Sequence, residues 1–110
     1  MIRIVFWQER GGSLTGFTVS GHSGYRPKGE DIVCAAVSAL AQTAVLSLKD
    51  HLEEEPRVSI REGFLECRLP ACLSPAGQEK ARVILKTIET GLNAIATDYG
   101  DYVRLEYRRV

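Results

Sequence analysis

The chain has 110 residues, enough for one domain with a single hydrophobic core. Its 14 basic and 14 acidic residues give a formal net charge of +0, so we expect no nucleic-acid partner. The longest apolar run, 32–41, is shorter than the roughly 18–20 residues that span a bilayer, so we expect no membrane partner. The first residues alternate like a strand and lack the apolar region of a signal peptide. We therefore expect a cytoplasmic protein whose three cysteines are free thiols.

Hydrophobic periodicity predicts five strands and two helices within a single domain, 1–110. Turns at 10–13 and 62–63 join neighbouring strands into two hairpins. This order, β-β-α-β-β-α-β, favours an α/β (α+β) two-layer sandwich with both helices packed on one face of a five-stranded sheet. The predicted elements are, in chain order, strands 2–8 and 14–20, helix 32–51, strands 57–61 and 64–69, a helix from Pro75 to just before Gly100, and strand 102–108.

The apolar pattern also predicts which side chains face the core. The first ten positions of helix 32–51 are almost wholly apolar, so we expect this helix to be buried over most of its circumference. Trp7 is expected on the open face of the sheet, where an exposed aromatic would mark a partner or dimer surface. The other residues expected to point inward are Val58, Ile60, Leu65, Cys67, Leu69, Val103, Leu105 and Tyr107 on strands, and Ala81, Ile84, Leu85, Ile88, Leu92, Ile95 and Tyr99 on the second helix.

A histidine and a cysteine are the residues that point most clearly to chemistry. His22 enters a glycine-rich loop at the end of a strand, and Cys34 lies in the first turn of the helix that follows. A helix N-terminus stabilises a thiolate, and a nearby imidazole can take and return the proton. A strand end and a helix start joined by such a loop can lie side by side at one edge of the sheet.

Each of these residues also has a purely structural interpretation. Cys34 would equally be a small buried apolar residue, and His22 an exposed loop residue. Asp31 is expected to cap the helix, with a role in orienting His22 as the less favoured alternative. Ser38, four residues after Cys34, would hydrogen-bond within the site or back to the Cys34 carbonyl.

The remaining cysteines and histidine give weaker signals. Cys67 alternates in phase with core leucines, whereas Cys72 follows a proline in a loop. A zinc site made of His22 and the three cysteines is disfavoured because the paired close spacing of structural zinc motifs is missing. His51 is expected at the surface near a helix C-terminus. We therefore expect no metal and no cofactor.

Two segments of the chain resemble the bacterial ribosomal-processing cysteine protease family (Prp). They are Gly21-His22-Ser23-Gly24-Tyr25 and the run from Gly29 to Leu40, which contains Asp31-Ile32-Val33-Cys34-Ala35-Ala36-Val37-Ser38. Length and element order agree with the family over the whole chain. The resemblance implies a single cysteine-protease domain with His22 and Cys34 as the catalytic pair. It assigns supporting roles to Gly21, Asp31 and Ser38.

The resemblance also implies a function. Family members are cytoplasmic homodimeric endopeptidases that remove the N-terminal extension of a large-subunit ribosomal protein, L twenty-seven, after a Phe-rich motif. The partner expected here is therefore a peptide substrate, and loop 23–30 would close over it. The alternative is a non-catalytic ribosome-assembly or protein-binding module that uses the sheet face or the C-terminal arginines.

Overall fold

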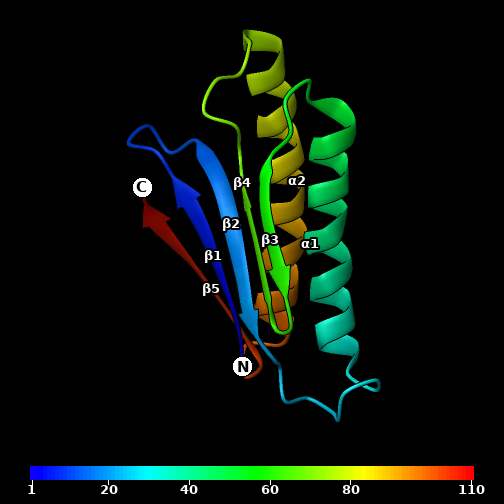
Figure 1. The fold of residues 1–110 in the computed structure, drawn as a ribbon. Helices are drawn as coiled ribbons and strands as arrows, with labels where there is room; N and C mark the ends of the chain where they lie inside the picture. The colour runs from blue at the N-terminus through cyan, green and yellow to red at the C-terminus, as the bar shows by residue number, and fades with distance from the viewer.

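The computed structural model describes residues 1–110 and contains the predicted five strands and two helices in the predicted order. The strands are β1 (Ile2–Gln8), β2 (Leu14–Gly21), β3 (Arg57–Arg61), β4 (Phe64–Arg68) and β5 (Val103–Arg109), and the helices are α1 (Ile32–His51) and α2 (Pro75–Asp98). They form an α+β sandwich, with both helices on one side of the sheet (Figure 1).

The sheet has the strand order β3-β4-β2-β1-β5. Three pairings are antiparallel, and β1 pairs in parallel with β5, so the first and last strands of the fold lie side by side. The core fills the space between the sheet and the helices. It contains Phe6 and Phe17 from the sheet and Leu48, Leu85 and Leu92 from the helices, all fully buried.

Both helices begin with a side-chain cap. Asp31 accepts a hydrogen bond from the Cys34 N–H, and Ser74 accepts one from the Gly77 N–H, with Pro75 in the first helical position. Proline is suited to this position because its missing N–H would have no intrahelical partner there. These caps fix where α1 starts, and thereby where Cys34 lies.

α1 is more exposed than its composition predicts. Six of its residues are buried against the core, while Ile32 and Leu46 are among the exposed large apolar side chains of the molecule. By length and composition α1 could also cross a membrane. The helix stays largely apolar beyond residues 32–41, so its apolar length is greater than that run alone. Its buried face joins the same core cluster as the sheet and α2, which is the packing of a core helix.

Two strand residues expected in the core are largely outside it. Ile60 is 64% exposed and Tyr107 is 43% exposed. They lie on β3 and β5, the two edge strands of the sheet. Alternation along a strand gives the face on which a side chain lies, but the helices do not cover that face as far as its edges.

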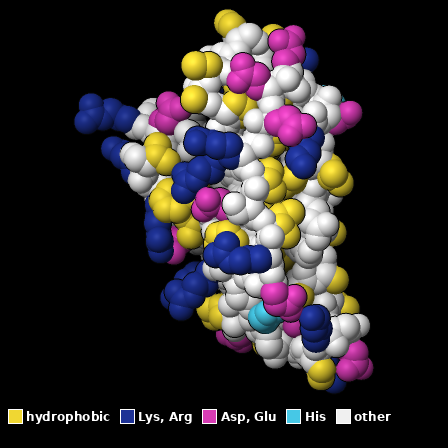
Figure 2. All heavy atoms as spheres, in the orientation of Figure 1, with side chains coloured by type: hydrophobic (Ala, Val, Ile, Leu, Met, Phe, Trp, Pro, Cys, Tyr) yellow, Lys and Arg dark blue, Asp and Glu magenta, His cyan; other side chains and the backbone are white.

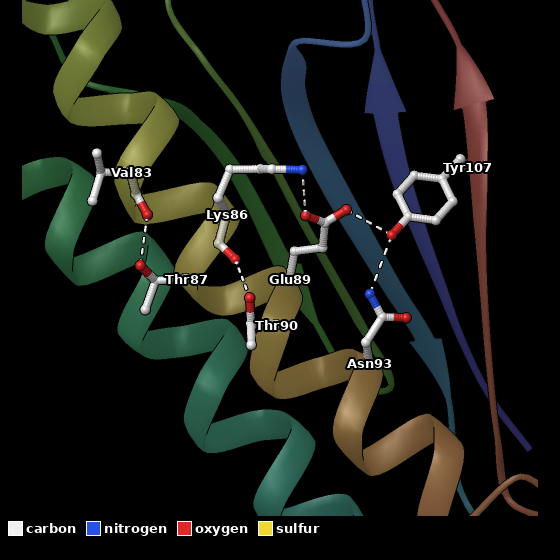
Figure 3. A network of polar contacts seen from close by, with 7 residues as sticks. All are labelled: Val83, Lys86, Thr87, Glu89, Thr90, Asn93 and Tyr107. Atoms are coloured by element: carbon white, nitrogen blue, oxygen red, sulfur yellow. Dashed lines mark hydrogen bonds and ion pairs between the residues drawn. The ribbon is translucent and has the colours of Figure 1, made fainter.

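Tyr107 instead belongs to a polar network between β5 and α2 (Figure 3). Its hydroxyl donates to the Glu89 carboxylate at 2.6 Å and accepts from Asn93 Nδ2 at 3.2 Å. Lys86 Nζ approaches the same carboxylate at 2.9 Å. Glu89 is buried, so these partners compensate for the removal of its charge from water.

Candidate active site

The site lies at the end of β2 that leads into the loop before α1, at the bottom of Figure 1. Gly21 ends the strand with φ +87°, and a Cβ there would lie 2.4 Å from the Met1 carbonyl oxygen. Only glycine fits both conditions. The Gly21 N–H donates to the Gly63 carbonyl at 2.9 Å, which ties the end of β2 to the β3–β4 turn.

His22 is exposed and its ring lies against that turn. A Cβ built on Gly63 would be 3.1 Å from His22 Nε2, so glycine at this position leaves room for the imidazole. His22 makes no side-chain hydrogen bond in this structure. Its neighbourhood is charged, because Glu62 in the same turn pairs with Lys28 of the loop at 3.0 Å.

Cys34 lies in the first turn of α1 and is partly exposed. Its N–H donates to Asp31 Oδ1 at 2.9 Å, and its Sγ accepts the N–H of Ser23 at 3.3 Å. The peptide that supplies this N–H joins Ser23 to His22, so the His22 backbone is held next to the thiol.

Ser23 connects the loop to the helix start, a role that no sequence pattern indicates. It is buried, and its hydroxyl donates to Asp31 Oδ2. The same hydroxyl accepts the N–H of Tyr25 at 3.1 Å. Asp31 therefore uses one carboxylate oxygen to cap α1 and the other to hold the loop.

These contacts set the electrostatics of Asp31. Burial raises the pKa of its carboxyl group, but the hydrogen bonds from the Ser23 hydroxyl and from the backbone at Cys34 and Arg26 outweigh burial and lower the pKa to about 2. Asp31 is therefore ionised at neutral pH. It makes no hydrogen bond to His22, so the structure supports the capping interpretation of this residue.

Residues 22–31 are held at two further points. The ring of Tyr25 packs edge-on against Tyr102 and Tyr99, with centroids 5.1 Å and 5.9 Å away. The Lys28–Glu62 pair is highly exposed at both ends, and exposed ion pairs are worth at most about 1 kcal/mol. The loop is thus anchored firmly at Tyr25 and weakly at Lys28.

The fold brings some of the predicted site residues into contact and leaves others apart. Cys34, Asp31 and the loop after His22 converge, whereas the His22 ring rests on Gly63 and makes no hydrogen bond to Cys34. Neither interpretation of Ser38 describes this structure. The side chain of Ser38 is exposed, and its hydroxyl accepts from Gln42 Nε2 at 2.7 Å, one turn along the helix.

The other cysteines lie away from the site. Cys67 is fully buried in the core as predicted, and burial raises the pKa of its thiol to about 11. Cys72 is exposed. Nowhere in the structure do three His, Cys, Asp or Glu side chains come close enough to hold a metal ion.

A hollow of about 760 Å³ in the surface is also remote from Cys34. It is lined by the β1–β2 turn, the segment after β4 and the first half of α2. This is the end of β2 opposite to His22, and no predicted site residue lines the hollow.

The chain is similar to known proteins over almost its whole length. A family model described as cysteine protease Prp matches residues 1–104. The ribosomal processing cysteine protease Prp of Bacillus subtilis (strain 168) is 28% identical over 107 residues, covering 96% of either chain. The protein of the same name from Staphylococcus aureus (strain Mu50) is 26% identical over 97 residues, covering 88% of this chain and 90% of its own.

Solved structures agree with these matches. The S. aureus ribosomal processing protease Prp, in complex with a covalently linked product peptide, aligns with a TM-score of 0.86 at 26% identity, covering 98% of this chain and 100% of its own. A Streptococcus mutans protein, SMU.848, aligns with a TM-score of 0.84 at 25% identity, covering 100% and 96%. Sequence, fold and the paired His22 and Cys34 segments together show that this chain belongs to the Prp family of ribosomal processing cysteine proteases.

Proposed function

We propose that this protease removes the N-terminal extension of a ribosomal protein L twenty-seven precursor, with Cys34 as nucleophile and His22 as general base. The observation that carries the proposal is the hydrogen bond from the Ser23 N–H to Cys34 Sγ at 3.3 Å. It places the one partly exposed cysteine in a helix first turn, beside the backbone of the histidine. A relative bound to a covalently linked product peptide supports a peptide substrate.

The reaction would proceed in two steps. In the first, His22 takes the Cys34 thiol proton, and Sγ attacks the scissile carbonyl carbon. His22 then gives the proton to the leaving amine, the C–N bond breaks and a thioester forms. In the second, His22 takes a proton from water and the hydroxide attacks the thioester carbonyl carbon. The C–S bond breaks as the acid product leaves, and His22 returns the proton to Sγ.

This mechanism requires the His22 ring to turn from Gly63 toward Cys34. The ring is exposed, packs on Gly63 and makes no side-chain hydrogen bond, so the rotation breaks no hydrogen bond. The Ser23 N–H holds the peptide that follows His22 beside Sγ, so the histidine backbone already lies next to the nucleophile. We propose that an extended peptide, covered by loop 23–30, favours the turned rotamer.

Backbone N–H groups at the start of α1 are the proposed stabilisers of the oxyanion. The Cys34 N–H already donates to Asp31, so it is occupied in this structure. The N–H groups of Ile32 and Val33 have no intrahelical acceptor, because they belong to the first turn. They are therefore the donors that this site offers to a tetrahedral intermediate.

Cleavage of a precursor peptide tests the proposal. The peptide spans the expected junction after a Phe-rich motif, and its products are followed by mass spectrometry. Cys34→Ala should abolish cleavage, and His22→Ala should lower kcat by about 10²–10⁴-fold, which is the usual contribution of a general base. Substitution at either position has little reason to unfold the protein, since both side chains are accessible.

The chain supplies matched controls for both substitutions. Cys72 is an exposed cysteine and His51 an exposed histidine, both outside the site. Cys72→Ala and His51→Ala should cleave within about twofold of the parent. Cleavage by Cys34→Ala at the parental rate would refute the mechanism. A parent that leaves this peptide intact while cutting other peptides would refute the substrate assignment alone.

We further propose that the protein is a cytoplasmic homodimer. Its three cysteines are all free, which suits a reducing compartment, and α1 presents Ile32 and Leu46 to the outside. Sedimentation velocity should give twice the chain mass of 12.2 kDa. Leu46→Lys should shift the protein toward the monomer if α1 forms the interface. A parental species of 12.2 kDa at all concentrations would contradict the dimer.

A further inference from the structure

The face of the sheet away from the helices carries arginines in two rows. Strand register aligns one row across the sheet, made of Arg57, Arg68, Gly16, Trp7 and Arg108, and a second row made of Arg61, Phe64, Ser20, Arg3 and Arg104. A row between them contains Glu66 and Glu106. We call this surface the arginine face. Basic side chains gather over the strands in Figure 2.

The net charge of zero does not reveal that positive charges are concentrated on this face. The arginine face has six arginines and two glutamates, so its positive charges exceed its negative charges by four. Since the whole chain is neutral, the rest of the molecule has an equal negative excess. Only Arg68 and Arg108 pair with carboxylates, those of Glu66 and Glu106. The other four arginines are exposed and unpaired, and their charge is available to a partner.

The two aromatic side chains on this face are each stacked with an arginine. The Arg68 guanidinium lies 4.7 Å from the centroid of the Trp7 ring, and that of Arg61 lies 3.9 Å from the Phe64 ring. Trp7 is fixed in place because its Nε1 donates to Thr18 Oγ1 at 3.0 Å. Each stack presents a flat guanidinium next to a flat ring, and nucleic-acid bases stack on both kinds of surface.

We propose that the arginine face binds single-stranded RNA. Arg3, Arg57 and Arg104 supply contacts to phosphates, and the Trp7–Arg68 and Arg61–Phe64 stacks supply platforms for unpaired bases. An acidic protein would use the charges but not the platforms. This proposal departs from the expectation of no nucleic-acid partner, which rested on total charge alone. The face borders the site at the β3–β4 turn, where the His22 ring packs on Gly63 between Arg61 and Phe64, so RNA binding is measured directly and not through cleavage.

Titration of the full chain against labelled RNA tests the proposal. The probe is a fluorescein-labelled single-stranded RNA of mixed sequence, about 20 nucleotides long, and binding is followed by anisotropy in KCl from about 50 to 200 mM. Affinity should fall steeply with salt. Trp7 is the only tryptophan of the chain, so its fluorescence should be quenched as bases stack nearby.

Two double variants with the same charge change localise the binding. Arg57→Gln/Arg104→Gln removes two unpaired arginines from the face, whereas Lys49→Gln/Lys80→Gln removes two exposed lysines from the helices. The first should weaken binding at least tenfold and reduce the slope of log K against log salt by about 1.4, at about 0.7 per phosphate contact. The second should bind within about twofold of the parent.

Several outcomes would overturn the proposal. They are no anisotropy change at about 100 μM protein in the lowest salt, equal weakening by both double variants, or binding without any change in Trp7 fluorescence. Equally tight binding of a poly-glutamate peptide of the same length would assign the face to acidic proteins. Loss of self-association in Arg57→Gln/Arg104→Gln, with no RNA binding by the parent, would assign it to a second copy of this chain.

Discussion

Ser23 holds three parts of the site in one arrangement. Its hydroxyl donates to Asp31 and accepts from the Tyr25 N–H, while its own N–H donates to Cys34 Sγ. The hydroxyl fixes the backbone, and the backbone aims the N–H at sulfur. Ser23 is therefore a positioning residue that acts on the nucleophile through its main chain.

Ser23→Ala should separate these two roles, because alanine keeps the N–H and loses the hydroxyl. We expect Tm to fall by about 4–8 °C, as for a loss of about 1 kcal/mol in a domain of this size. Cleavage should slow by about tenfold in kcat with a smaller change in KM, since the thiol is less well positioned. Ser13→Ala, at an exposed serine in the β1–β2 turn, is the control. Parental Tm and kcat in Ser23→Ala would show that the hydroxyl has no such role.

The same residue predicts a dependence on pH. The folded state lowers the pKa of Asp31 from 3.8 to about 2, so this carboxylate contributes stability above pH 3.8 that is lost as the pH falls toward 2. In Ser23→Ala one lowering contact is missing, and the contribution is smaller. The Tm difference between parent and variant should therefore shrink from about pH 5 to about pH 2.5. A constant difference across this range would contradict the assignment.

Among the structural elements, the loop before α1 depends on the end of α2. Tyr25 packs against Tyr99 and Tyr102, which lie between α2 and β5. Most of the buried contact of residues 24–30 comes from this one ring, because the Lys28–Glu62 pair is exposed.

Tyr25→Ala should therefore release the loop and leave the rest of the fold in place. Trypsin cleavage after Lys28, measured by mass spectrometry, should become at least tenfold faster because local opening costs less. Tyr107→Ala, at the other end of β5, should leave this rate unchanged while lowering overall stability. An unaltered cleavage rate in Tyr25→Ala would show that the loop is held elsewhere.

The helices, strands and helix caps were predictable because they depend on residues that are close together in the sequence. Asp31 and Ser74 each lie next to an amphipathic run, and the bounds 32–51 of the first helix follow from residues within one or two turns. Ile60 and Tyr107 were placed wrongly because exposure depends on strand order, β3-β4-β2-β1-β5, which local pattern does not contain. α1 was expected to be more buried because most of its residues are small and apolar. Composition does not show which of these residues pack against the sheet or α2.

The site could be predicted only in part for a similar reason. His22 and Cys34 are marked by residue type and by their loop and helix context. The partner of the His22 ring is Gly63, on a distant hairpin that β4 brings beside β2. Ser23 has no signal of its own, because any serine beside a histidine would look the same before the chain folds.

Over the whole molecule, the reactivities of the buried Cys67 and the exposed Cys72 should report on folding. Burial raises the pKa of Cys67 to about 11, so only about a thousandth of this thiol is ionised at pH 8, whereas Cys72 is exposed. Iodoacetamide should label Cys72 quickly and Cys67 at least a hundredfold more slowly, as followed by peptide mass spectrometry. In urea the two cysteines should react alike. Equal labelling in native buffer would contradict the buried position of Cys67.

The parallel pairing of β1 with β5 has a consequence for biosynthesis. The residues of the site are all translated by Gly63, but β1 keeps one open edge until β5, beginning at Val103, emerges and pairs with it. Tyr25 likewise cannot pack until Tyr99 and Tyr102 have been synthesised. Closing so long a segment is entropically slow, and the loop beside Cys34 cannot settle earlier. A nascent chain should therefore gain an ordered active site only after β5 has been synthesised.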